Sequence, residues 1–405
     1  MIKYCFYSLI LFCLTLGYGQ NNNSDSKDTY FIAPEFLFGK TVPANTFFPK
    51  ANLQTALFVD IGKNNFKNPN EWASWLYNPK TGIHLGVSDF GNAEKLGRSY
   101  TVMPYVEFGF SKWGLRRFNL KVGMGGAHVD TQYHPETNQF NKAITTKFTW
   151  AFRAFLYYDV FTIKNMPFRI GGGISHLSNG HARLPNQGLN ALLLSVSSRI
   201  NFNPERDIDP ETYEKKKFDR TLQYYYSIRT GIGQQTLLET QEEYNTKKEV
   251  YSAAVSAGKI YNKVLKVGVG FSYRFYEHYY DYIKENELED YNDHPYRNST
   301  NFNVFIGAEL LLSHVGLEWQ MGFNIYKPFY KEQWLLTEED GLNWYYEIKK
   351  ALPSRLGLKL YALNTSKSPK NNFFIGANIN SNFGQADFNE LSFGYVHRFE
   401  LKKRD

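Results

Sequence analysis

Apolar and polar residues alternate along this chain over stretches of about ten residues, and the alternation returns through most of its length. In the stretch 266–275 every second residue is apolar, namely Val267, Val269, Phe271, Tyr273 and Phe275. The same alternation recurs in 147–158, 316–325, 356–362 and 373–379. Successive side chains of a β-strand point to opposite faces. The pattern therefore predicts many strands, each with one apolar face and one polar face.

The residues on the polar faces indicate which kind of β protein this is. Lys, Arg, Glu and Gln stand at the centres of these strands, while 17% of the 405 residues are aromatic and the mean hydropathy is −0.47. An outer-membrane barrel has this pattern, with apolar side chains toward lipid and polar side chains in the lumen. We therefore predict an all-β fold, an antiparallel transmembrane β-barrel with roughly 12–16 strands. A water-soluble sandwich with outward polar faces is the alternative.

Residues 1–19 have the features of a secretory signal peptide. Lys3 provides a positive charge, 4–16 is almost wholly apolar, and Gly17-Tyr18-Gly19 offers small residues for cleavage. Both cysteines, Cys5 and Cys13, fall inside this segment, which leaves the mature chain without cysteine. No later stretch reaches the roughly 18 apolar residues of a spanning helix, so strands must cross the membrane. We expect one barrel domain over 20–405, located in the outer membrane.

Two lengths of connection separate the expected strands. Short ones at 164–167, 262 and 313–314 are expected to be periplasmic turns, and long polar ones at 203–220, 279–300 and 330–354 are expected to be surface loops. A short helix is expected within 332–350. The net charge of +7 suits contact with anionic lipid headgroups, and nucleic acid is not an expected partner in this compartment.

A histidine and a serine stand two residues apart at the end of the expected strand 168–178. His176 and Ser178 share a face with Ile170 and Ile174, and that apolar face is the one expected to meet lipid. A hydroxyl beside a general base is the arrangement that nucleophilic catalysis needs. A hairpin across 179–188 would bring Asn190 of the next strand close to His176. Polar groups of this kind are costly toward lipid and are usually functional, so we expect a lipid substrate.

The pattern His-x-Ser-Asn, followed by Pro-Asn-x-Gly at 185–188 and the outward residue 190, resembles the PagL-type lipid A 3-O-deacylase family. The resemblance is closest over 176–190 and looser over the first half of the mature chain, including 89–92. It implies an outer-membrane barrel with a Ser/His/Glu triad on its lipid-facing outside. It also implies hydrolysis of an ester-linked 3-hydroxyacyl chain of lipid A, with lipopolysaccharide as substrate and no obligate protein partner.

Carried over residue by residue, the resemblance implies Ser178 as nucleophile and His176 as general base. Asn179, with Gly180 beside it, corresponds to the oxyanion-stabilising position. Asn186 corresponds to the asparagine of the loop that shapes the site. Asn190 stands where the family has glutamate. An amide can orient the histidine but cannot stabilise an imidazolium as a carboxylate does, so weaker activity is expected. No metal or organic cofactor is expected.

Two other groups of polar residues do not form recognisable catalytic or metal sites. His128-Val129-Asp130 has no further ligand at metal spacing, and the acidic run 285–293 is expected to be a solvated loop. A second class of function stays open, in which the chain is a catalytically weak or inactive barrel that acts as a passive pore or a lipid-binding protein. Replacement of Ser178 by Ala distinguishes the two classes.

Overall fold

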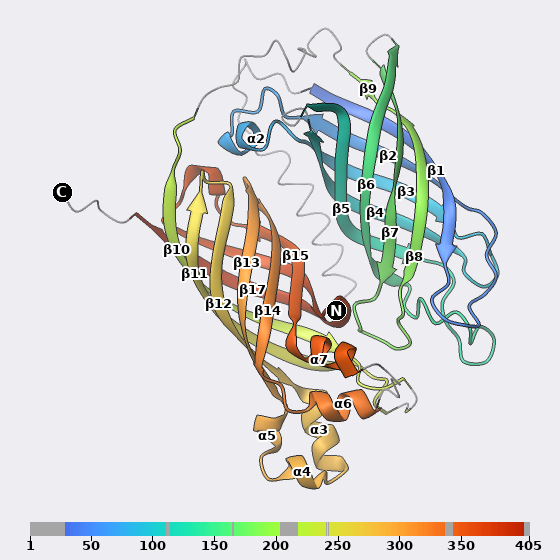
Figure 1. The fold of residues 1–405 in the computed structure, drawn as a ribbon, viewed down its shortest axis with the longest axis vertical. Helices are drawn as coiled ribbons and strands as arrows, with labels where there is room; N and C mark the ends of the chain where they lie inside the picture. The colour runs from blue at the N-terminus through green and yellow to red at the C-terminus, as the bar shows by residue number, and fades with distance from the viewer. Residues whose placement is uncertain are drawn as a thin grey trace.

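The computed structural model describes residues 29–110, 114–163, 166–202, 218–239, 241, 243–336 and 343–400. The expected signal peptide over 1–19 and most of the connection 203–220 lie outside the described residues. Two β-barrels account for nearly all of the described strands (Figure 1). Neighbouring strands are antiparallel in both barrels.

The first barrel is closed by the pairing of its first and last long strands, in which Phe36 lies opposite Val196. Its strands are β1 (Thr29–Val42), β2 (Gln54–Asn64), β3 (Lys80–Asp89), β4 (Arg98–Phe110), β5 (Leu115–Val129), β6 (Phe148–Ile163), β7 (Met166–Ser178) and β8 (Leu189–Ser198). The short β9 (Ile200–Asn201) pairs with the beginning of β1.

The second barrel is closed in the same way by β10 and β17, with Ile228 opposite Tyr395. Its strands are β10 (Leu222–Gln235), β11 (Lys248–Tyr261), β12 (Leu265–Tyr276), β13 (Thr300–Leu312), β14 (Val315–Tyr326), β15 (Pro353–Tyr361), β16 (Asn371–Asn382) and β17 (Gln385–Phe399). The predicted antiparallel barrel class is confirmed. The structure differs from the expected single barrel because the strands close into two rings, and alternation within a strand does not determine which strand it pairs with.

Helices occupy the longer connections. They are α2 (Glu71–Trp75), α3 (Glu277–Glu285), α4 (Glu289–Asn292), α5 (Pro295–Asn298), α6 (Tyr330–Leu336), α7 (Asn343–Ala351) and the 3-10 helix η3 (Thr365–Lys367). The helix expected within 332–350 is confirmed as parts of α6 and α7. Among the described residues, no helix has the length and apolar character to cross a membrane. Helices α3 to α6 gather at one end of the second barrel (Figure 1).

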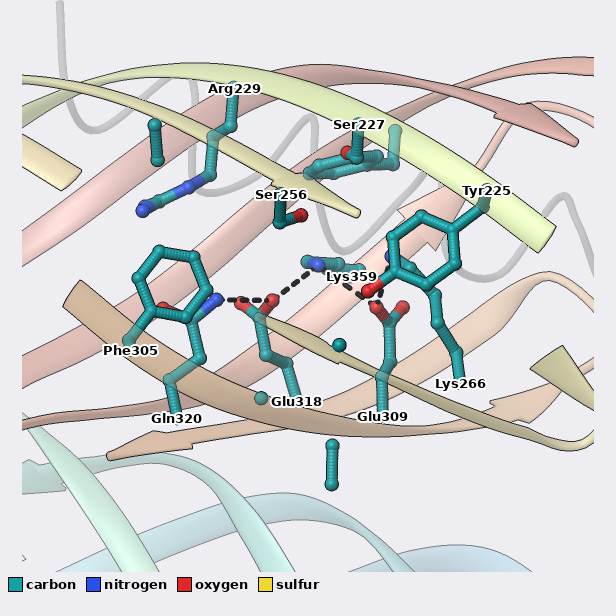
Figure 2. Close-up of a pocket in the computed structure, with 15 residues that line it drawn as sticks. Tyr225, Ser227, Arg229, Ser256, Lys266, Phe305, Glu309, Glu318, Gln320 and Lys359 are labelled. Carbon is teal, nitrogen blue, oxygen red and sulfur yellow. Dashed lines mark hydrogen bonds and ion pairs between the residues drawn. The ribbon is translucent and has the colours of Figure 1, made fainter. Parts of the chain in front are cut away.

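Both lumens are filled with paired charges. In the first barrel, Lys121 Nζ lies 2.5 Å from Asp60 Oδ2 and Arg169 Nη1 lies 2.9 Å from Glu107 Oε2. In the second, Lys359 Nζ lies between two glutamates, 3.0 Å from Glu309 Oε2 and 2.5 Å from Glu318 Oε1 (Figure 2).

These lumen contacts decide between the two fold classes that the sequence left open. The polar faces point into closed lumens, so the sandwich alternative, with its polar faces outward, is wrong. The cavity that remains among the lumen side chains of Figure 2 has a volume of about 30 Å³. It has room for one or two water molecules.

Helix α2 joins the two barrels at the end that carries the short turns. Trp72 Nε1 donates a hydrogen bond of 3.0 Å to Ser313 Oγ, and Lys263 Nζ lies 2.5 Å from Glu71 Oε1. The side chain of Val264 packs with Trp72 and Ala73. The short turns of the second barrel at 262–264 and 313–314 are therefore on the same side as the β2–β3 connection of the first.

Candidate active site

Strand β7 places His176 and Ser178 on the outer face of the first barrel. Ile170 and Ile174, six and two residues before His176 on the same face, are 52% and 46% exposed, whereas Arg169 and Leu177 are buried. The outward row of β8, which includes Leu192 and Leu194, is equally exposed. The direction expected from the alternation is therefore the direction observed, because closure of the barrel leaves the apolar set outside.

His176 and Asn190 are directly opposite each other in the β7–β8 register. The ring Nδ1 lies 2.8 Å from Asn190 Oδ1. Gly188 makes room for the ring, since a Cβ at this position would lie 2.7 Å from His176 Cε1. Gly188 also has a φ of +75°, which glycine adopts at little cost. The hairpin thus brings together the histidine and the asparagine that the sequence pairs.

Ser178 ends the strand and is only 6% exposed. Its Oγ accepts two hydrogen bonds, one of 2.8 Å from Asn186 Nδ2 and one of 3.2 Å from the Gly180 N–H. In the part of the chain that the structure describes, no hydrogen bond joins His176 to Ser178. The two residues share a face and an outer surface, but the serine hydroxyl is turned toward the loop that follows it.

The side chain of Asn179 organises this loop, residues 179–188, which we call the site loop. Its Nδ2 donates to Arg183 O at 2.7 Å and its Oδ1 accepts from the Ala182 N–H at 3.1 Å. Its backbone N–H donates to Asn186 Oδ1 at 3.0 Å, which orients the Asn186 amide so that Nδ2 faces Ser178. The donors near Ser178 Oγ are therefore Gly180 and Asn186, and the Asn179 amide is used within the loop.

The second barrel contacts this site, which the sequence did not predict. Asn389 Nδ2 donates to Asn179 O at 2.7 Å, and Trp150 Nε1 of β6 donates to Asn389 Oδ1 at 2.7 Å. The Thr236 N–H donates to His181 O at 3.1 Å. One signal was available in the sequence: Asn389 is the polar first member of the outward row that continues with the exposed Leu391 and Phe393.

His181 lies in the site loop where the loop meets the second barrel. Burial lowers the pKa of its imidazole, and the negative charge of Asp387 in the second barrel opposes that shift only in part. The backbone of Thr236 also opposes the shift, whereas His278 adds to it. The neutral ring is therefore the form that this environment favours.

One cluster of described residues has the ligand types of a metal site. Glu35, Asp60 and His84 place one ligand atom each within 4.8 Å of one another inside the first lumen. Lys121 Nζ lies 2.5 Å from Asp60 Oδ2, and Arg153 Nη1 lies 3.6 Å from Glu35 Oε2. Two cations already balance the two carboxylates, so this cluster is a buried ion-pair network of the barrel interior. It is on the opposite side of the barrel wall from His176.

Two other positions that the sequence singled out have structural contacts of their own. His128 packs edge-to-face against Phe148 with ring centroids 5.2 Å apart, and Asp130 Oδ1 accepts from the Arg98 N–H at 2.7 Å. The acidic run 285–293 contains the last residue of α3 and the whole of α4.

Comparisons with known proteins give two family matches, and the boundary between the matches falls between the two barrels. Residues 63–199 match the family model described as lipid A 3-O-deacylase (PagL), and residues 222–400 match that of the acyloxyacyl hydrolase C-terminal domain. The first match ends after β8, and the second begins with β10. No curated protein matches the chain.

Three solved structures that are similar to the chain are distant from it in sequence. CdiB from Acinetobacter baumannii matches with 8% identity and a TM-score of 0.15, over 92% of this chain and 60% of that one. An outer membrane channel from Pseudomonas putida F1 has 8% identity, a TM-score of 0.18 and coverage of 94% and 100%. A mutant of the Rh. blastica porin has 8% identity, a TM-score of 0.17 and coverage of 92% and 100%.

Proposed function

The chain belongs to the PagL-type lipid A 3-O-deacylase family, and we propose that it is an outer-membrane esterase that removes an ester-linked 3-hydroxyacyl chain from lipid A. In this proposal Ser178 is the nucleophile and His176 is the general base. The observation that carries it is the hydrogen bond of 2.8 Å between His176 and Asn190, on the outer face beside a serine that two amide donors approach. A substrate in the membrane reaches this face without entering the lumen.

The hydrogen bond to Asn190 sets the tautomer of the histidine. When Nδ1–H donates to Asn190 Oδ1, the lone pair of Nε2 is free to accept a proton. The Ser178 hydroxyl rotates from its resting contacts toward Nε2, which takes its proton while Oγ attacks the ester carbonyl carbon. The resulting imidazolium then protonates the leaving sugar oxygen, and the acyl chain stays on Ser178 as an ester.

The two donors near Ser178 suit the negative charge that develops on the carbonyl oxygen. The Gly180 N–H and Asn186 Nδ2 already lie within hydrogen-bond distance of Oγ, and the carbonyl oxygen of the intermediate is bonded to the carbon that Oγ attacks. A water molecule, deprotonated by His176, then attacks the acyl-serine carbon. This step releases the fatty acid and returns the proton to Ser178.

The side chains that fill both barrel interiors argue against the alternative of a passive pore. Eight-stranded barrels have interiors that side chains can fill, and here paired Lys, Arg and Glu side chains occupy both lumens. Tyr276, Tyr279 and Phe329 belong to a buried cluster that includes residues of α3, the helix at one end of the second barrel (Figure 1). An esterase that acts on the outer wall needs no open lumen.

Mass spectrometry of lipid A tests the proposal. Cells that express the wild-type chain should lose one 3-hydroxyacyl chain from part of their lipid A, and cells that express Ser178→Ala should not. The matched control is Ser175→Ala, because Ser175 is on the opposite face of the same strand. Identical acyl patterns for the wild type and Ser178→Ala would contradict the esterase function.

A further inference from the structure

Asn389 is a polar residue on the outer wall of the second barrel, near the beginning of β17. Its neighbours Phe388 and Glu390 are buried and face inward, so Asn389 faces outward. The next outward residues, Leu391 and Phe393, are 64% and 55% exposed, as a lipid-facing row requires. An uncharged amide at the head of such a row is costly to place against lipid unless it is hydrogen-bonded.

Both ends of the Asn389 amide are engaged by the first barrel. Trp150 Nε1 donates to Oδ1 at 2.7 Å, and Nδ2 donates to Asn179 O at 2.7 Å. An indole N–H can only donate and a backbone carbonyl can only accept, so the amide has one orientation that satisfies both partners. Trp150 is also the direct neighbour of Ser178 in the β6–β7 register. Asn389 therefore links β6, the strand that pairs with β7 at Ser178, to Asn179, the residue that follows Ser178.

The same side chain packs against Gly180, which provides one of the two donors near Ser178 Oγ. A Cβ at position 180 would lie 1.9 Å from Asn389 Oδ1, so this contact is possible only with glycine. Gly180 has a φ of +64°, which glycine adopts at little cost, and its N–H donates to Ser178 Oγ at 3.2 Å. Asn389 thus covers the short segment 178–180 from outside, where lipid or water would otherwise be.

Further contacts hold the rest of the site loop on the second barrel. The Leu184 N–H donates to Asn245 Oδ1 at 3.2 Å, and Asn245 Nδ2 donates to Leu184 O at 3.1 Å. Lys142, close to the loop, forms an ion pair of 2.6 Å with Glu239. These contacts anchor the distal part of the loop, and Asn389 is the contact nearest to Ser178.

We propose that the second barrel completes the active site of the first, with Asn389 as the residue that positions the Gly180 donor relative to Ser178. This inference rests on the proposed esterase function. Asn389 does not reach the reacting atoms, so it acts through Asn179, Gly180 and Trp150. Its loss lets the segment 178–180 relax, which misaligns the donor with the oxyanion while the outer surface that binds substrate stays in place.

Kinetics of full-length variants in detergent micelles containing lipid A test this role. Asn389→Ala should lower kcat by about ten- to a hundredfold, with KM within about twofold of wild type, because misplacement of a catalytic group affects the transition state more than substrate binding. Asn389→Asp keeps the acceptor for Trp150 but loses the donor to Asn179 O, and should be impaired to a similar degree. Trp150→Phe removes only the other hydrogen bond and should be milder.

The matched control is Asn371→Ala, which removes an exposed asparagine from β16 at the far end of the same barrel. Its kcat should equal that of the wild type. Wild-type kcat in Asn389→Ala and Asn389→Asp would overturn the positioning role while leaving the esterase function intact. Failure of the esterase proposal itself is recognised separately, because Ser178→Ala and the wild type would then give the same lipid A.

Hydrogen exchange gives a second readout that does not depend on activity. Amides of 178–184 should exchange at least about tenfold faster in Asn389→Ala than in wild type, while peptides from β2, β3 and β12 to β14 should be unchanged. Unchanged exchange in 178–184 would overturn the inference even if the wild-type chain had no activity on lipid A. If Asn389→Ala unfolds as a whole, the strand peptides will also exchange faster. In that case the exchange of 178–184 is measured in Asn389→Asp, which retains the Trp150 contact.

Discussion

At the scale of single residues, Asn190 stands where the resemblance to the deacylase family implies a glutamate of the proposed triad. Its amide oxygen lies 2.8 Å from His176 Nδ1, so the geometry of the third position is present although its charge is not. A neutral amide orients the ring, whereas a carboxylate also stabilises the imidazolium formed in the transition state. In the proposed mechanism the Asn190 amide therefore orients the His176 ring but does not stabilise the imidazolium.

Replacement of Asn190 by Asp should raise deacylase activity, because Asp has the same length and adds the missing charge next to His176. We expect an increase in kcat of about tenfold or more, since exchange of the acid for an amide in a catalytic triad has large effects on kcat. Lipid A hydrolysis by purified protein measures it. Asn190→Leu, which can neither orient nor stabilise the ring, is the control and should be inactive. Equal rates for Asn190→Asp and wild type would contradict the expected effect of the charge, and wild-type activity in Asn190→Leu would mean that Asn190 has no part in catalysis.

At the scale of elements, the strands were the predictable part and the site loop was not. The alternating stretches 266–275, 316–325 and 373–379 all fall within single strands, β12, β14 and β16. A strand also fixes which residues share a face, so His176, Ser178 and Asn190 could be assigned to one surface. The loop of residues 179–188 has no such period. Its hydrogen bonds among Asn179, Asn186 and Gly180 depend on where each amide points.

The site loop should loosen at acidic pH. Burial lowers the pKa of His181, so the folded loop favours the neutral ring more than the unfolded chain does. A group with a lowered pKa of this kind contributes stability that is complete at neutral pH and is lost as the pH falls below the ordinary histidine value of about 6.5. Hydrogen exchange of 179–188 should therefore be faster at pH 5 than at pH 7, after correction for intrinsic exchange.

His181→Gln is the matching variant for this pH dependence, because it cannot gain a proton in this range. The difference between pH 5 and pH 7 should shrink in it. His278 of α3 also has a pKa lowered by burial, so some dependence should remain near α3. An unchanged pH effect at 179–188 in His181→Gln would show that another group controls the loop.

At the scale of the whole molecule, the strands form two closed barrels where one larger barrel was expected. The closure of each ring at eight strands keeps the lumens narrow enough for side chains to fill them. Contacts at both ends, through α2 at one and the site loop at the other, connect the rings. The serine is therefore located where one barrel meets the next.

The filled lumens predict that the protein does not conduct ions. Purified protein in a planar bilayer should give no stable conductance steps at moderate voltage, because paired charges and a cavity of about 30 Å³ leave no continuous water path through the second barrel. An established porin inserted under the same conditions provides the positive control. Reproducible single-channel steps that disappear with an antibody against the chain would contradict this reading of the lumens.

The sequence by itself determined the class of fold and the two faces of each strand, because these follow from local periodicity. It led to the proposed site residues through side-chain chemistry and the resemblance to the deacylase family. Only the tertiary structure decided that the strands close into two rings, because closure depends on pairing between strands far apart in sequence. It also decided that Gly180 and Asn186 approach Ser178 and that Asn389 covers them. Residues 178 and 389 are more than two hundred positions apart, and only the packing of one barrel on the other brings them together.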